Sequence, residues 1–126
     1  MDFSSLNENL NDKLENWISD IKNKNCNTVI YSLSDINYKL GFDEMITTFN
    51  VPNVCFAMCS FDNETDIFFK SRNIPSILLD KTKNNFKHLV CISKFLLTYI
   101  LLKNGFNVIM NEADIFRANR IFKKTL

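Results

Sequence analysis

Glycine and proline are scarce in this chain of 126 residues, which contains Gly 2 and Pro 2. Phosphate-binding loops of the GxGxxG and GxxxxGK[ST] types need several glycines at fixed spacing, and neither pattern occurs. The charges are balanced, since Lys+Arg 15 against Asp+Glu 14 gives a net charge of +1. No field of one sign therefore attracts nucleic acid, and any ligand must be recognised locally.

Histidine occurs once, as His88, and the four cysteines form no CxxC pair. The usual spacing of a structural zinc site is therefore missing. Cys55 and Cys59 have even spacing in an apolar run, which on a strand places both on one face, and we predict reduced core thiols. His88 has no Ser or Cys nucleophile at an identifiable spacing, which favours a surface or capping role.

No hydrophobic run is long enough for a bilayer span. The longest apolar stretch, Leu89 to Leu102, contains Ser93 and Lys94 and is shorter than the ~20 residues that a span requires. We interpret it as a buried helix. The first residues are acidic and polar, where a signal peptide has a basic segment followed by an apolar one, so the sequence predicts no secretory signal.

Hydrophobic residues make up 46% and charged residues 23%, an average globular composition. Apolar residues recur with helical spacing in some segments, and short β-branched runs lie between them. The pattern predicts helices at residues 3–22, 36–49, 64–71 and 86–103, and strands at 28–31, 54–58, 77–79 and 106–110. This alternation predicts a single α/β domain with a mostly parallel sheet of about four strands, flanking helices and an N-terminal amphipathic helix.

The ends of these helices carry recognisable caps. Ser34 or Asp35 can cap the second helix, and Gly105 follows the last residue of the long helix. The long helix is apolar nearly all round, so it must be covered on all sides. We expect a protein partner or a missing C-terminal half to cover residues 86–103.

Ligands of open parallel sheets collect beyond the carboxyl ends of the strands. Polar or acidic residues occupy all of these places in the predicted fold, namely Ser32–Asp35, Ser60–Asn63, Asp80 and Asn111–Asp114. Loop starts and helix caps use the same residue types, so a structural interpretation stays open for each.

A family resemblance appears in the second half of the chain. A helix bearing Lys94 leads through Gly105-Phe106-Asn107-Val108 into a strand followed by Glu112-Ala113-Asp114. This stretch resembles nucleotide-diphospho-sugar transferases of the GT-A type, in which an acidic D-x-D motif follows a strand. Residues 28–34 and 56–62 resemble the first two strands of that family. The resemblance covers about residues 27–120 and implies a Rossmann-like GT-A half.

Two carboxylates one residue apart at a strand end can meet one divalent cation, which in turn takes diphosphate oxygens. The resemblance thus implies Mn²⁺ or Mg²⁺ at Glu112 and Asp114. Glu112 stands where the family usually has Asp, so the geometry must adjust for one methylene. Alternatively, both are solvated acids, with Asp114 capping the next turn. Lys94 can either reach a phosphate or extend its ammonium to the surface.

The preferred hypothesis is a glycosyltransferase-like domain that binds a nucleotide-diphosphate sugar. Its nucleotide-sugar-binding residues would be Ser32, Ser34, Asp35, Asp62, Lys94 and Asn111. The alternative is a non-catalytic or truncated α/β interaction module whose apolar face, around Phe95 and Tyr99, meets another chain.

Transferases of this family bind the acceptor with a second half after the acidic motif. We therefore expect a fragment, a chain that needs a partner subunit, or a reduced relative that binds a nucleotide without turnover. A complete chain predicts a cytoplasmic location, and a fragment predicts the secretory-pathway lumen.

Overall fold

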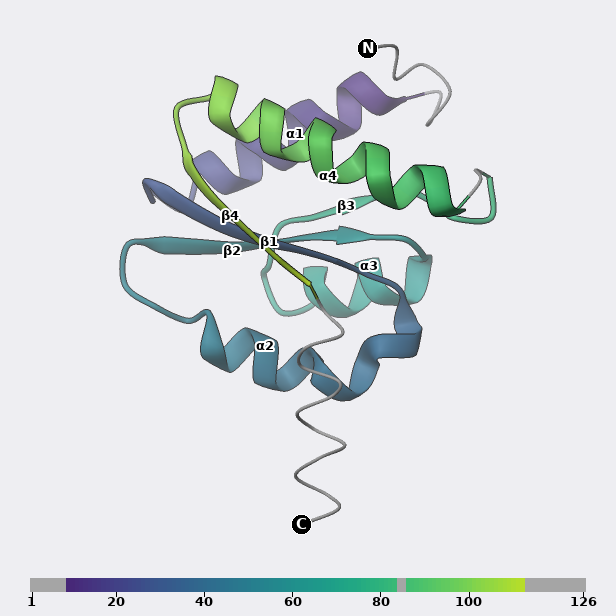
Figure 1. Cartoon of the computed structure of the whole chain (residues 1–126). Coiled ribbons are helices and arrows are strands. Elements are labelled where there is room, and N and C mark those ends of the chain that lie inside the picture. The colour runs from purple at the N-terminus through teal and green to yellow at the C-terminus, as the bar shows by residue number, and fades with distance from the viewer. Residues whose placement is uncertain (1–8, 84–85, 113–126) are drawn as a thin grey trace.

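The computed structural model describes residues 9–83 and 86–112 and has an α/β architecture around a four-stranded, all-parallel sheet (Figure 1). The strand order is β3-β2-β1-β4. The strands are β1 (Thr28–Ser34), β2 (Val54–Ser60), β3 (Ser76–Leu78) and β4 (Asn107–Glu112). The helices are α1 (Leu10–Lys22), the 3-10 helix η1 (Ile36–Gly41), α2 (Phe42–Thr48), α3 (Asn63–Lys70) and α4 (Phe86–Lys103). The predicted fold class is confirmed.

Helices cover both faces of the sheet, with α1 and α4 on one face and α2 and α3 on the other (Figure 1). The larger core cluster lies on the α1/α4 side and includes Trp17, Tyr31 and Leu97. A smaller cluster of Phe42, Met45, Met58 and Phe69 fills the α2/α3 side. The apolar spacing of α1 explains its place in this arrangement, because its inward positions are all buried: Leu10, Leu14, Trp17, Ile18 and Ile21. Phe3 and Leu6, predicted in the same helix, lie outside the described residues.

Each strand is preceded by a residue in the left-handed backbone region. Asn25 (φ 56), Asn53 (φ 67) and Asn73 (φ 62) precede β1, β2 and β3, and Gly105 (φ 87) precedes β4. Asn and Gly tolerate this conformation better than other residues, and at Asn25, Asn73 and Gly105 it occurs in the turn directly after a helix. The predicted place of Gly105 after the long helix is confirmed.

The prediction that Leu89 to Leu102 forms a buried helix is wrong for half of α4. Leu89, Leu97 and Leu101 are fully buried, whereas Phe95 and Tyr99 are 62% and 59% exposed. The physical reason is that α4 is an outer layer on the sheet, so its opposite side faces solvent (Figure 1). Within residues 9–83 and 86–112, we find no helix with the length and apolarity to cross a bilayer.

Several predicted boundaries also differ from the structure. The helix predicted at 36–49 is divided into η1 and α2 at Gly41, and β1 and β2 extend to Ser34 and Ser60. The fourth strand begins at Asn107 and extends to Glu112, because β4 pairs with β1 from Thr28↔Asn107 to Leu33↔Glu112. Asn111 and Glu112 are therefore strand residues, whereas the sequence placed them after the strand.

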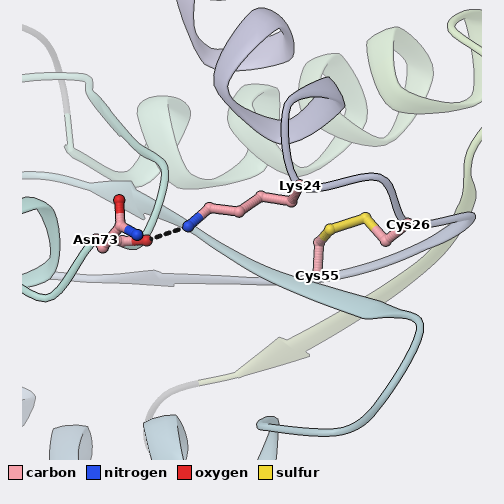
Figure 2. The surroundings of a disulfide bond; sticks show 4 residues. All are labelled: Lys24, Cys26, Cys55 and Asn73. Atoms are coloured by element: carbon pink, nitrogen blue, oxygen red, sulfur yellow. Dashed lines mark hydrogen bonds between the residues drawn. A yellow bond between two sulfur atoms is a disulfide. The ribbon is translucent and has the colours of Figure 1, made fainter.

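The prediction of reduced core thiols is correct for Cys59 and wrong for Cys55. Cys59 is a buried free thiol, and burial raises its pKa. Cys55 forms a disulfide with Cys26 across a Cα–Cα distance of 5.8 Å, a usual separation for such a bond (Figure 2). The sequence did not indicate this pair, because Cys26 lies in the polar connection before β1 and only the sheet brings it beside the start of β2. Nearby, the Lys24 ammonium donates to the Asn73 carbonyl at 2.7 Å (Figure 2).

Candidate functional site at the carboxyl edge of the sheet

The candidate site lies where the strand order reverses. The chain proceeds from β1 to β2 and β3 on one side, and β4 then pairs with β1 on the other side. In open parallel sheets the crevice at such a switch point, beyond the carboxyl ends of the strands, is where ligands bind. The register places Ser32 opposite Asn111 and Leu33 opposite Glu112. The structure thus brings Ser32 beside Asn111 on one face of the sheet and Lys94 beside Glu112 on the other face.

Ser32 is the most informative residue at this junction. Its side chain is fully buried in β1, and its hydroxyl oxygen has no hydrogen-bond partner within the described part of the chain. Buried hydroxyls are usually paired, so an unpaired one needs an explanation. Asn111 points to the same face of the sheet, because directly paired residues of neighbouring strands do so, and it is half-buried. By contrast, the Ser34 hydroxyl already donates to the Asp35 carbonyl at 2.8 Å.

Asp35 has a clear structural role after β1. One carboxylate oxygen accepts from the Asn37 N–H at 3.0 Å and caps η1, and the other accepts from the Lys81 ammonium at 2.9 Å. The Asp35 side chain is 5% exposed. Its hydrogen bond raises the pKa of Lys81. Of the two candidate caps that the sequence offered, Asp35 is the one used.

Asp62 connects two neighbouring loops at the same edge. Its Oδ1 accepts from the Thr65 N–H and caps α3, and its Oδ2 accepts from the Ile36 N–H at the start of η1, both at 2.9 Å. Partial burial acts to raise the pKa of Asp62, but the hydrogen bonds from Thr65 and Ile36 outweigh it and hold this pKa below its usual value. Both oxygens are thus occupied by the protein itself.

Lys94 and Glu112 form an ion pair across the space between α4 and the end of β4. Their side chains are 33% and 47% exposed, so solvent reaches the pair. The backbone of Lys94 also fixes α4 to the sheet, because the Tyr31 hydroxyl donates to the Lys94 carbonyl at 3.0 Å. Lys94 therefore neutralises the carboxylate that the sequence predicted as a metal ligand.

Of the two predicted metal ligands, the structure describes Glu112, and Asp114 lies outside the described residues. Among residues 9–83 and 86–112, no group of three or more His, Cys, Asp or Glu side chains is arranged to hold a metal ion. Glu112 alone does not form an all-protein cage. A nucleotide-bound Mg²⁺ needs fewer protein ligands, since one or two carboxylates plus phosphate oxygens and waters usually complete its coordination shell. The Glu112 carboxylate fits that smaller donor set.

Lys81 is a residue of this edge that sequence reasoning missed. It follows Asp80, which the sequence did single out, and its ammonium bonds Asp35. Asp80 accepts from the Thr82 N–H and hydroxyl at 2.9 and 2.7 Å, and these bonds hold its pKa low. The signal available in the sequence was the position of Lys81, two residues after the third predicted strand.

The fold and this edge define an α/β chain with a Rossmann-like parallel sheet and a polar switch point. Comparisons with protein-family models, with curated proteins and with solved structures find no significant match to the chain.

Proposed function

We propose that the chain binds a nucleotide-diphosphate sugar through a divalent cation at the junction of β1 and β4, as part of a glycosyltransferase. The observation that carries this proposal is the buried, unpaired hydroxyl of Ser32 at the switch point, on the same face of the sheet as Asn111. Glu112, one register position further, points to the face that α4 covers, so the ligand would extend around the carboxyl ends of β1 and β4 to reach both faces. A polar atom without a partner at the place where parallel sheets bind nucleotides is available to a ligand. The resemblance of 105–114 to the GT-A motif supports the same assignment.

The residues of the edge then divide into those that bind the ligand and those that hold the loops in place. Ser32 and Asn111 offer a hydroxyl and an amide to the nucleoside. Glu112 binds Mg²⁺ or Mn²⁺ in place of the Lys94 ammonium, and Lys94 then contacts a diphosphate oxygen as a point charge. Asp35 and Asp62 hold the loops in place, because their oxygens accept hydrogen bonds from the protein. Asp114 remains a proposed second metal ligand.

Glycosyl transfer itself breaks the bond between the anomeric carbon and the diphosphate and forms a bond from that carbon to an acceptor oxygen. The acceptor hydroxyl loses its proton, and the nucleoside diphosphate leaves. The bound cation supplies Lewis-acid stabilisation of the charge that develops on the leaving group. Among the residues of this chain, Lys94 would share that stabilisation. We assign no acceptor-binding residue.

The disulfide favours one compartment over the other. Disulfides persist in oxidising compartments and are rare in the cytosol. The Cys26–Cys55 bond therefore supports the secretory-pathway lumen as the working location of the chain.

The first test measures thermal unfolding with Mn²⁺ and UDP or GDP, added separately and together. We expect the melting temperature to rise when both are present, because a ligand at one hundred times its Kd stabilises by about 2.7 kcal/mol. Glu112→Ala, alone and combined with Asp114→Ala, should abolish the rise. Glu64→Ala, which removes an exposed acid of α3, is the matched control and should retain it. No rise in the unmodified chain would contradict the proposal.

A second arm of the same experiment uses Ser32→Ala. This variant removes the unpaired hydroxyl and leaves the packing of β1 intact, so it should fold normally and lose nucleotide affinity. Ser71→Ala removes an exposed hydroxyl at the end of α3 and is its control. Equal nucleotide affinity in Ser32→Ala and the unmodified chain would remove the observation on which the proposal depends.

A second candidate function, the interaction module, is favoured by a different observation. Large apolar side chains remain exposed on α4 and on the edge strand β4: Phe95, Tyr99, Leu102, Ile109 and Met110. Met110 points to the face of the sheet that α4 covers, and Ile109 points to the other face. Exposed apolar side chains of this kind mark interaction sites. The two functions do not exclude each other, because the apolar residues lie outside the candidate nucleotide site.

A further inference from the structure

A cavity lies at the amino edge of the sheet, at the end opposite the candidate nucleotide site. Its volume of about 420 Å³ is within the usual range of small-ligand pockets, about 300–1,000 Å³. Three turns before neighbouring strands meet here, and the end of α2 adds a further wall. Residues 24–26 precede β1, residues 53–56 include the start of β2, and residues 72–75 precede β3. We call this hollow the amino-edge cavity.

Apolar side chains form one part of the cavity wall. They are half-buried and pack against the smaller core cluster on the α2/α3 side: Ile46, Phe49, Phe56 and Ile74. The ring centroids of Phe49 and Phe56 are 5.2 Å apart, with an angle of 50° between the ring planes. An apolar or aromatic group of a ligand would lose its exposure to water against these side chains.

The charged side chains of the described cavity wall are both basic. Lys24 and Arg72 line the cavity, and no Asp or Glu of the described residues does. Neither cation has a carboxylate partner in the part of the chain that the structure describes. The Lys24 ammonium donates to the Asn73 carbonyl at 2.7 Å, so it lies beside the residue that follows Arg72 (Figure 2). The cavity is therefore electrostatically suited to an anion.

The Arg72 guanidinium is held in place and keeps donors for a ligand. It lies over the Phe68 ring, 3.5 Å from the centroid, and its Nη1 donates to the Phe68 carbonyl at 3.1 Å. Its other bond, to the Ser71 hydroxyl at 3.2 Å, also uses Nη1. A guanidinium has five N–H donors, so those on Nη2 and Nε remain for the oxygens of an anion.

Asparagine amides add neutral donors around the cavity. The asparagines that line it are all exposed: Asn25, Asn50, Asn53 and Asn73. Three of them are the residues with left-handed backbone before β1, β2 and β3, so the turns that carry them have a defined conformation. Amide N–H groups can donate to phosphate oxygens without changing the charge of the site.

We propose that the amino-edge cavity binds a phosphate monoester with a small apolar or aromatic organic group. The phosphoryl group carries a charge of about −1.5 to −2 near pH 7, which matches the charges of Lys24 and Arg72. A carboxylate carries only one negative charge and would leave one cation without a partner. The organic group would contact Phe49 and Phe56. This site does not depend on the proposed nucleotide site, because the two sites share no residue.

The test titrates the full chain with phenyl phosphate, without divalent cations, and follows the backbone amide chemical shifts by NMR. We expect saturable shifts at residues 24–26, 53–56 and 72–74, and none at 107–112. Inorganic phosphate lacks the apolar group and benzoate carries a single charge, so each should bind at least about tenfold more weakly. Binding elsewhere, no binding, or equal affinity for either of these two probes would overturn the proposal.

Variants of the two cations test the charges. Lys24→Gln and Arg72→Gln should each weaken phenyl phosphate binding by about tenfold, because each removes one charge-assisted contact. Lys24→Arg keeps the charge and should stay within about threefold of the unmodified chain. Lys39→Gln removes an exposed cation of η1 outside the cavity, is the matched control, and should bind normally.

Circular dichroism establishes that each of these variants is folded. Unchanged affinity in both Gln variants of the cavity would overturn the proposal. Equal losses in Lys24→Gln and Lys24→Arg would also overturn it, because the contact with Asn73, and not the charge, would then explain the effect. An equal loss in Lys39→Gln would show that the anion responds to net charge alone, which contradicts a built site.

Discussion

The Asp62 carboxylate joins η1 and α3 through both of its oxygens, and this makes its charge matter for stability. Asp62→Asn places an NH₂ group against one of two N–H donors, so the isosteric change leaves a donor unpaired. We expect the free energy of unfolding to fall by about 1–2 kcal/mol near neutral pH. Urea denaturation at several pH values measures it. Asp20→Asn, at an exposed position of α1, should change it by less than about 0.5 kcal/mol.

The pH dependence follows from the lowered pKa of Asp62. Its pKa is lower in the folded chain than in the unfolded one, so the stability that it contributes is fully present above the ordinary Asp pKa of about 3.9. That stability is lost as the pH falls through the lowered pKa of the folded state. The difference between Asp62→Asn and the unmodified chain should therefore shrink in acid. A difference that stays constant down to pH ~2 would contradict this account.

The roles of single residues depend on burial and strand register, which the sequence does not show directly. Asp35 and Asp62 were candidate ligands or caps, and the structure shows both as caps. Their residue type and position after a strand fit both roles, so sequence could not choose. Ser32 was a candidate on position alone. Its unpaired state depends on how β1 pairs with β4, which no local pattern encodes.

Elements were more predictable than residues where local signals were strong. The bounds of α4 were predicted because apolar spacing and a terminal Gly105 mark them, and its exposed half was missed because layer position is not local information. The division between η1 and α2 at Gly41 was missed because the apolar pattern continues across it. The extension of β4 to Glu112 depends on pairing with β1. Tertiary contacts, and not propensity, decide such boundaries.

Gly105 allows a test of how an element ends. It has φ 87, and a Cβ added there meets no atom within 4 Å, so a substitution acts through backbone strain alone. Gly105→Ala should reduce the free energy of unfolding by about 1–2 kcal/mol. Gly105→Asn should cost less, because Asn tolerates this conformation and occupies the equivalent place before β1, β2 and β3. Urea denaturation of the unmodified chain and the two variants measures the order of their free energies of unfolding. An equal cost for Ala and Asn would contradict this explanation.

At the scale of the molecule, the candidate site and the disulfide lie at opposite ends of the sheet. The candidate nucleotide site occupies the carboxyl edge of β1 and β4, and the Cys26–Cys55 disulfide occupies the opposite edge (Figure 2). The disulfide closes a loop with a sequence separation of 29, which includes all of β1, η1 and α2. It therefore restricts the unfolded chain over a quarter of its length without contacting the site.

This separation predicts that loss of the disulfide affects stability and not ligand binding. Cys26→Ala with Cys55→Ala should lower the free energy of unfolding by about 3–4 kcal/mol, because the unfolded chain regains the entropy of that loop. Below the melting temperature, the affinity for Mn²⁺ with UDP or GDP, measured by calorimetry, should stay within about twofold of the unmodified chain, a change of less than 0.5 kcal/mol. Cys91→Ser, which removes an exposed thiol, is the control and should change neither quantity. Circular dichroism establishes that the variant without the disulfide is folded. Weaker binding by that folded variant would mean that the two ends of the sheet are coupled. The assignment of one edge to stability and the other to nucleotide binding would then be wrong.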